Sequence, residues 1–239
     1  MQHLEQLSLT GKKLKISIIT SSSLKANTEY NLVPLGYKQG LRGAKDGFCY
    51  FGAKKYQYIS GNKAIVNDII LPLEPDTVEQ HRGQHFCIYY DVTKDSYMLK
   101  DMFLGFGTFF KVRNYLQVKN DLLIFIGEHY LLFNLLSQTE IKVKIFGKNQ
   151  GDFRFRAEEV KENLAKIGRG EYCDIILQDY LASKVHCCLR FLEKWELVDG
   201  DGEKLSTNGV WVYVNEPLEI EDGMYFKANH TIFQTTLYK

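Results

Sequence analysis

The sequence predicts an all-β protein that contains two copies of one fold. Tyr and Phe each occur 15 times in the 239 residues, Pro occurs only 4 times, and no low-complexity run interrupts the chain. This composition favours strands. Short apolar runs of strand type at 173–177, 186–191 and 195–198 alternate with polar loops. A chain of this length also exceeds the usual single domain, so two domains are expected.

An internal repeat relates the two halves of the chain. Four anchor residues recur at an offset of 101 or 102 residues, and the strand pattern around them recurs as well. A near-constant offset over a long stretch indicates two copies of one fold. We expect the copies to span 1–138 and 139–239. The anchor pairs are His85 and His186, Gly107 and Gly209, Leu116 and Leu218, and His129 and His230.

Individual segments fit this scheme with one exception. In the first copy, 14–20 reads as a strand, and the glycine-rich stretch 36–47 reads as a loop or, alternatively, as a phosphate-contacting loop without a recognised spacing. In the second copy, the alternation of apolar residues over 141–146 predicts the first strand. The segment 157–166 has helical propensity, so we expect either a short helical insertion there or a strand imposed by tertiary contacts.

Composition also limits the class of protein. Lys and Arg total 30 against 29 for Asp and Glu, so no basic excess indicates nucleic acid. The start of the chain does not resemble a secretory signal, and no apolar run is long enough for a membrane helix. Five Cys, an odd number, fit reduced thiols. We therefore expect a cytoplasmic or nuclear protein, with a ciliary or cytoskeletal location as an alternative, and no membrane partner.

Three polar clusters in the second copy indicate a phosphate-binding rim. Arg169 offers a planar fork of donors, Ser183 a hydroxyl, Lys184 a second positive charge and Asn208 an amide that both donates and accepts. Short strands separate the clusters and would bring their loops to one edge. A phosphorylated, extended peptide suits this set of groups.

Each of these residues also has a purely structural interpretation. Arg169 could be an ordinary surface arginine, and Ser183 could cap a turn through its own backbone. His186 opens an apolar strand, where histidines are more often structural than catalytic. Asn208 and Gly209 form a turn signal by themselves. Only the combination of clusters in this order favours the phosphate interpretation.

The order of these clusters resembles the forkhead-associated (FHA) domain family. Ile167-Gly168-Arg169, the Ser183-to-His186 spacing and Asn208-Gly209 before a strand carry the resemblance, which covers roughly 142–239. It implies a β-sandwich of twisted antiparallel sheets that binds a phosphothreonine peptide through loops at one end. The residues expected to contact the phosphopeptide are Arg169, Ser183, Lys184, Thr207 and Asn208, with Gly168, His186 and Gly209 as structural support of the site.

The first copy departs from the family at each ligand position. Ala53 stands where the arginine is expected, Arg82 where the serine is expected, and Phe106 where the asparagine is expected. Loss of these donors removes the pairing that offsets the desolvation of a phosphate. We expect a structural or protein-docking module, although Arg82 with Lys54 and Lys55 would offer an improvised anion site.

Two functions from different classes fit the sequence. The first is a phosphothreonine-dependent adaptor whose second domain binds a phosphorylated protein and whose first domain binds another protein partner. The second is a scaffold or assembly subunit, cytoskeletal or ciliary for example, whose domains pack against partners without phosphate. We find no nucleophile, phosphate-loop or metal pattern, so we expect no enzyme, no cofactor and no metal; a pair formed by His81 and His85 lacks a third ligand.

Overall fold

The computed structural model describes residues 2–72, 83–148, 150–160 and 164–239. These residues are mostly in strands, with one short helix, α1 (Gln2–Thr10), which confirms the predicted all-β class. The chain forms two compact units. Unit 1 comprises Met1–Phe110 together with Val214–Lys239, and unit 2 comprises Lys111–Tyr213.

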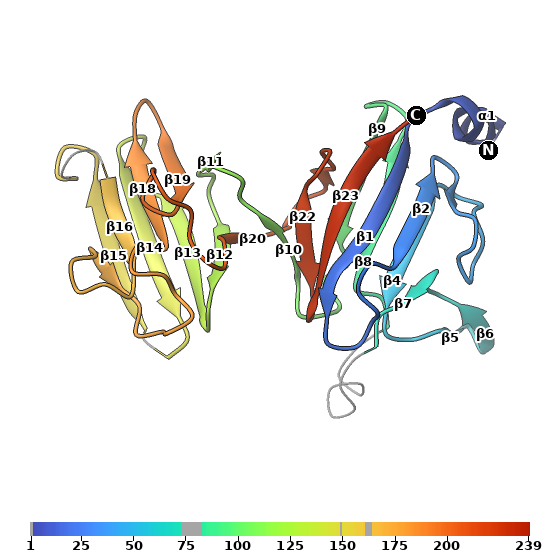
Figure 1. Ribbon diagram of the computed structural model, residues 1–239, viewed down its shortest axis with the longest axis horizontal. Helices are drawn as coiled ribbons and strands as arrows, with labels where there is room; N and C mark the ends of the chain where they lie inside the picture. Colours follow the sequence, from blue (N-terminus) through green and yellow to red (C-terminus); the bar gives the residue numbers. More distant parts are fainter. Residues whose placement is uncertain (1, 73–82, 149, 161–163) are drawn as a thin grey trace. The chain divides into compact units, whose positions relative to one another are not determined.

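Unit 2 contains two layers of sheet (Figure 1). Phe133 and Val143 from one layer and Ile167, Leu189 and Leu197 from the other are fully buried, so the core lies between the layers. One layer has the order β15 (Gly151–Arg156), β14 (Glu140–Phe146), β13 (His129–Leu135), β12 (Leu122–Ile126) and β20 (Trp211–Tyr213); the other has the order β11 (Tyr115–Gln117), β19 (Trp195–Asp199), β18 (Cys187–Phe191), β16 (Leu164–Gly168) and β17 (Ile175–Ile176).

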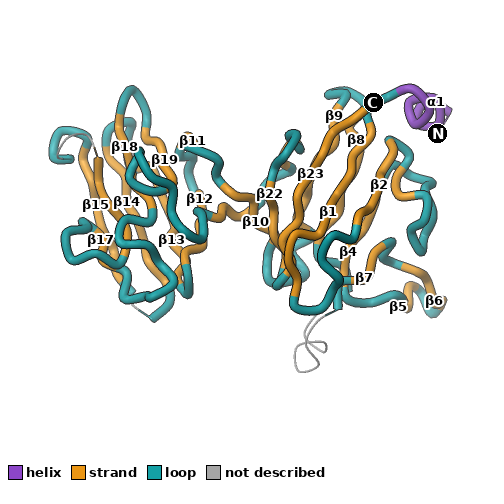
Figure 2. The backbone as a smooth tube through the Cα atoms, viewed as in Figure 1, coloured by secondary structure: helices purple, strands orange, loops and turns teal. Residues whose placement is uncertain are grey.

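Unit 1 also has two layers (Figure 2). Buried aromatic side chains contribute to the core of this unit. Phe51 stacks on Phe86 at 4.3 Å between ring centroids, and Phe226 stacks on Phe233 at 4.8 Å. One layer has the order β10 (Thr108–Lys111), β22 (Tyr225–Ala228), β23 (Thr231–Tyr238), β1 (Lys13–Ser21), β2 (Glu29–Val33) and β3 (Gly36–Tyr37); the other has the order β21 (Leu218–Glu219), β9 (Ser96–Asp101), β8 (Phe86–Asp91), β4 (Phe48–Gly52) and β7 (Ile69–Ile70), and β5 (Tyr56–Ile59) pairs with β6 (Asn62–Ile65) as a separate hairpin.

The last strands of each unit pair in the same way. In unit 2, β11 pairs with β19, β12 with β20 and β13 with β14. In unit 1, β21 pairs with β9, β22 with β10 and β23 with β1. Under the predicted repeat, with an offset of 102, 115–135 and 217–237 are equivalent segments. Each copy therefore completes the unit that the other copy begins.

The compact units consequently differ from the predicted domains 1–138 and 139–239. The expected boundary falls between β13 and β14, which are paired neighbours inside unit 2. The physical reason is that β13 and β23 both alternate buried and less buried residues, so either strand suits the same kind of partner. A repeat offset identifies equivalent strands but does not say which of two equivalent partners each one pairs with.

The segment 157–166 is not a helix in its described part. Residues 157–160 form a turn and a bend, 161–163 lie outside the described residues, and 164–166 belong to β16. β16 pairs with both β17 and β18, so sheet hydrogen bonds outweigh a helix propensity of a few tenths of a kcal/mol per residue. Of the two expectations, the strand imposed by tertiary contacts describes this part of the chain.

Candidate functional site

Three loops of unit 2 meet at one end of the sheet that contains β16, β18 and β19. Ile167 of β16 pairs with Cys187 of β18, and Cys187 pairs with Asp199 of β19. The segments after β16, before β18 and after β19 therefore leave the sheet at the same edge. We call the exposed ends of these loops the rim; it contains the five predicted ligand residues Arg169, Ser183, Lys184, Thr207 and Asn208.

Arg169 is exposed but its side chain is oriented by the neighbouring loop. Its backbone N–H donates to Ser183 O at 3.0 Å, and its Nε donates to Ala182 O at 2.9 Å. The two terminal guanidinium nitrogens have no hydrogen-bond partner among the described residues. The Nε contact therefore fixes the plane of the fork and leaves its outer donors available for an anion.

Ser183 and Thr207 connect two of the three loops. Thr207 N–H donates to Ser183 Oγ at 3.0 Å, and Ser183 Oγ–H reaches Thr207 Oγ1 at 3.4 Å. The second distance is at the long end of the range for a hydroxyl donor. A ligand oxygen that accepted from Ser183 would replace a weak hydrogen bond.

Asn208 is held at both its side chain and its backbone. Nδ2 donates to Leu181 O at 2.9 Å, and the backbone carbonyl accepts from Trp211 Nε1 at 3.0 Å. Within the described chain, no partner occupies Oδ1. This oxygen can accept a hydrogen bond from the backbone of an extended peptide.

Lys184 contributes charge at the rim, while its backbone supports the neighbouring turn. Its carbonyl accepts from Gly170 N at 2.9 Å, and its side chain is exposed and forms no ion pair with any described acid. With Arg169 it gives the rim two positive charges. An anionic ligand fits this arrangement.

The three predicted support residues are buried. His186 Nδ1 accepts from Ser183 N at 3.1 Å, and His186 Nε2 lies 3.1 Å from Gly209 O. Burial is the main reason that the pKa of His186 lies below its ordinary value, so the ring is neutral at neutral pH. Gly209 has φ of +77°, in the left-handed region, and a Cβ on Gly168 would overlap the carbonyl of Lys184.

Part of the sequence is similar to a known family of modules. The family model of the FHA domain matches residues 165–227. FHA domains are phosphopeptide-binding modules for protein–protein interaction. The match covers a minority of the 239 residues, but it includes all five rim residues and the three support residues. No curated protein and no solved structure matches the chain.

The FHA match runs past the end of unit 2. It continues through β21 and most of β22, which belong to unit 1. One contiguous FHA sequence thus contributes strands to both units. Under the predicted repeat, this agrees with an exchange of the last strands between the two copies.

Unit 1 contains a comparable buried histidine but has other residues at the positions that the predicted repeat makes equivalent to the rim. His85 Nε2 lies 3.1 Å from Gly107 O, as His186 does from Gly209 O. Under the predicted repeat, Ala53 and Phe106 are equivalent to Arg169 and Asn208, while Arg82 and His81 lie outside the described residues. Arg42, in the glycine-rich stretch 36–47, pairs with Asp46 and Asp68 at 2.5 and 3.1 Å rather than remaining open to a phosphate.

Two site residues went unrecognised in the sequence. Asp179 is buried in the loop before β18, and His129 contacts it with Nδ1 at 3.3 Å from Oδ2. The sequence marks His129 only as an anchor of the repeat. Its contact with Asp179 was not predictable, because no local sequence pattern connects residues 50 positions apart. A second repeat signal was also available, since Asp68-Ile69-Ile70-Leu71 recurs at 174–177 and both aspartates accept a backbone N–H from the adjacent strand.

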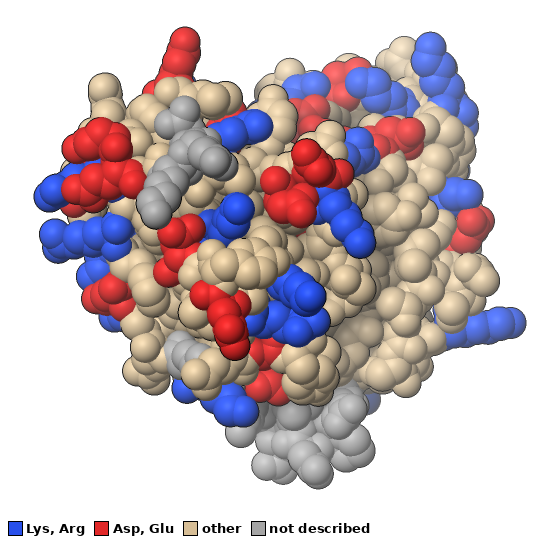
Figure 3. All heavy atoms as spheres, turned by 60° about the vertical axis from the view of Figure 1, so that its left-hand side comes forward, with Lys and Arg blue, Asp and Glu red and all other residues tan. Residues whose placement is uncertain are grey.

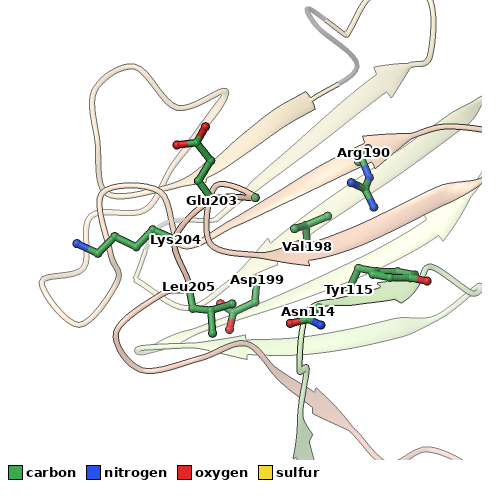
Figure 4. Close-up of a pocket in the computed structure, with 9 residues that line it drawn as sticks. Asn114, Tyr115, Arg190, Val198, Asp199, Glu203, Lys204 and Leu205 are labelled. Atoms are coloured by element: carbon green, nitrogen blue, oxygen red, sulfur yellow. The ribbon is translucent and has the colours of Figure 1, made fainter.

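A pocket of about 300 Å³ lies beside the loop after β19 (Figure 4). Arg190 in this pocket is already paired with Glu196 at 2.5 Å, and Lys204 extends away from Arg190 and Tyr115. Asp199 Oδ1 holds Ser206 Oγ at 2.6 Å, which anchors the loop that leads to Thr207. The pocket thus contains charges of both signs, and its Asp199 holds the loop that leads to the rim.

Surface charge, possible metal ligands and helix length bear on other classes of ligand and partner. Basic and acidic side chains are interspersed on the face shown in Figure 3, in keeping with the net charge of +1. In the described part of the chain, no group of three or more His, Cys, Asp or Glu residues could hold a metal ion. No helix among these residues has the length and apolar character to cross a membrane.

Proposed function

We propose that this chain is a phosphothreonine-dependent adaptor, and that the rim of unit 2 binds the phosphorylated segment of a partner protein. The observation that supports the proposal is the orientation of the Arg169 side chain. Its Nε is committed to Ala182 O, which aims the guanidinium, while its terminal nitrogens stay open. A merely solvated surface arginine has no need of such an anchor.

The other rim residues supply complementary contacts. The phosphate would take charge-assisted hydrogen bonds from Arg169 and Lys184, which are roughly twice as strong as neutral ones. Ser183 would donate its hydroxyl in place of the 3.4 Å contact to Thr207. Asn208 Oδ1 would accept from the peptide backbone. Thr207 would lie beside the ligand and hold the Ser183 hydroxyl through its own N–H.

A preference for phosphothreonine over phosphoserine would come from the additional methyl group. Burial of one such group contributes about 0.8 kcal/mol, which corresponds to several-fold discrimination. Tyr172, Tyr180 and Leu205 are exposed and lie within a few residues of the rim residues in the sequence. Their loops would contact the residues that flank the phosphothreonine.

Unit 1 favours a different kind of contact. Where the FHA segment has Arg169 and Asn208, the equivalent positions hold Ala53 and Phe106, and Phe106 is 55% exposed. An exposed aromatic in place of a polar donor suits a protein partner that carries no phosphate. Unit 1 would therefore bind a second protein or pack in an assembly, while unit 2 would bind the phosphorylated segment. The free, buried cysteines fit a cytoplasmic or nuclear setting for both interactions.

The test is titration with an oriented library of phosphothreonine peptides, with phosphoserine and unphosphorylated peptides alongside. Arg169→Ala removes charge-assisted hydrogen bonds worth roughly 1.5–3 kcal/mol, so we expect the Kd to rise about tenfold or more. Arg169→Lys keeps the charge but loses the fork and the Nε anchor, and should bind weakly too. Arg154→Ala, an exposed arginine on β15 of the same unit, is the control for lost charge.

Saturable binding that prefers phosphothreonine and is lost only in the Arg169 variants would support the adaptor. Equal binding by the wild type and by Arg169→Ala, or no phosphopeptide binding at all, would contradict it. The scaffold function, in which both units dock partners without phosphate, would then be the better explanation.

A further inference from the structure

A turn from outside the FHA match reaches the loop that shapes the rim. Gly127 and Glu128 connect β12 to β13, and His129 is the first residue of β13. Glu128 N–H donates to Asp179 Oδ2 at 2.6 Å, and His129 Nδ1 lies 3.3 Å from the same oxygen. A Cβ on Gly127 would overlap this carboxylate. Three consecutive residues thus converge on one side chain.

Asp179 connects this turn to the rim through hydrogen bonds to Leu181 and Ala182. Its Oδ1 accepts from Leu181 N at 2.8 Å, and its carbonyl accepts from Ala182 N at 3.1 Å. The carbonyls of Leu181 and Ala182 are the groups that hold Asn208 Nδ2 and Arg169 Nε. A displacement of Asp179 would therefore move both acceptors that orient the rim.

The charge of the Asp179 carboxylate strengthens its hydrogen bonds to this turn. Burial by itself raises the pKa of Asp179, but the hydrogen bonds from Glu128, Leu181 and His129 outweigh it and the net pKa is lowered. The carboxylate is thus ionised at neutral pH and only accepts hydrogen bonds. The proton of His129 must then lie on Nδ1 for this contact to form. The ring itself is fully buried, which limits its alternative orientations.

We propose that the turn 127–129 positions the rim, with His129 and Asp179 as positioning residues for phosphopeptide binding. The nature of the ligand rests on the proposed function, whereas the positioning itself does not. The turn precedes the matched residues 165–227 and belongs to the first copy of the predicted repeat. The second copy therefore does not carry a complete site, and the strand exchange gives the first copy a direct role in recognition.

The first test measures amide hydrogen exchange in the full chain. In His129→Leu, which keeps bulk but loses the donor, we expect the amides of Leu181 and Arg169 to exchange roughly tenfold faster. Amides in the centre of β18 should keep their wild-type rates. His129→Asn places an amide nitrogen near the position of Nδ1 and should restore slow exchange. His230→Leu, at an exposed histidine in the turn between β22 and β23 of unit 1, is the control.

The second test measures binding of the best phosphothreonine peptide to the same variants. His129→Leu should raise the Kd roughly tenfold, His129→Asn should restore it, and His230→Leu should leave it unchanged. Because His129 and Asp179 act through one contact, the double variant His129→Leu with Asp179→Asn should bind about as weakly as the weaker single variant.

The outcomes separate the two proposals. If the wild type binds no phosphothreonine peptide, the adaptor proposal fails, while the exchange rates still decide whether the turn positions the loop. If the loop amides of His129→Leu exchange no faster than those of the wild type, or speed up only together with the β18 amides, the positioning role is overturned. Wild-type affinity in His129→Leu would overturn it as well.

Discussion

His186 couples the stability of unit 2 to pH through two hydrogen bonds. Its Nδ1 accepts from Ser183 N and its Nε2 contacts Gly209 O, both at 3.1 Å, inside a fully buried site. An N–H can only donate, so Nδ1 carries no proton and the hydrogen of the neutral ring lies on Nε2. A second proton, on Nδ1, would face the Ser183 N–H and break that hydrogen bond.

The sign of the pH dependence follows from the direction of the shift. Burial lowers the pKa of His186 from its ordinary value of 6.5, so the unfolded chain takes up this proton at a higher pH than the folded chain. Stability is therefore complete above about pH 6.5 and declines as the pH falls toward the folded pKa. One proton limits the slope to about 1.4 kcal/mol per pH unit.

The measurement is urea unfolding at several pH values, followed by tryptophan fluorescence. Both tryptophans, Trp195 and Trp211, are buried in unit 2, so the signal reports on this unit alone. His186→Leu removes two hydrogen bonds and should cost about 1–3 kcal/mol near neutral pH. It should also flatten the decline between about pH 6.5 and pH 5. An equal slope in the wild type and in His186→Leu would refute this account, and His230→Leu is the control for the replacement of a histidine at an exposed position.

Two further predictions concern the backbone and the thiols. Gly209→Ala places a side chain at φ of +77° and should destabilise unit 2 by about 1–2 kcal/mol in the same fluorescence assay; an unchanged midpoint would show that the turn relaxes freely. Burial raises the pKa of Cys87 and of Cys188 to about 12, and all five cysteines are buried and free. A thiol reagent at about pH 8 should therefore label the native protein slowly and label all five thiols after unfolding, and rapid labelling of native protein would contradict the buried arrangement.

The sequence by itself predicted the all-β class and the positions of many strands. The alternation over 141–146 and the apolar runs at 186–191 and 195–198 correspond to β14, β18 and β19. These strands can be predicted from local sequence, because apolar residues that alternate with period two indicate a strand with one buried face. The sequence also indicated which polar residues would share an edge, because Arg169, Ser183 and Asn208 each follow or precede a strand of the same sheet.

Tertiary structure alone decided how the equivalent strands are distributed. β13 and β23 have similar burial patterns and would satisfy the same partners, so their alternation contains no information on which unit each one completes. The same is true of 164–166, whose helical propensity is smaller than the gain from pairing with β18. The contact between His129 and Asp179 likewise follows from packing, because two buried polar groups 50 residues apart meet only once the hairpin of β12 and β13 has packed against the loop before β18.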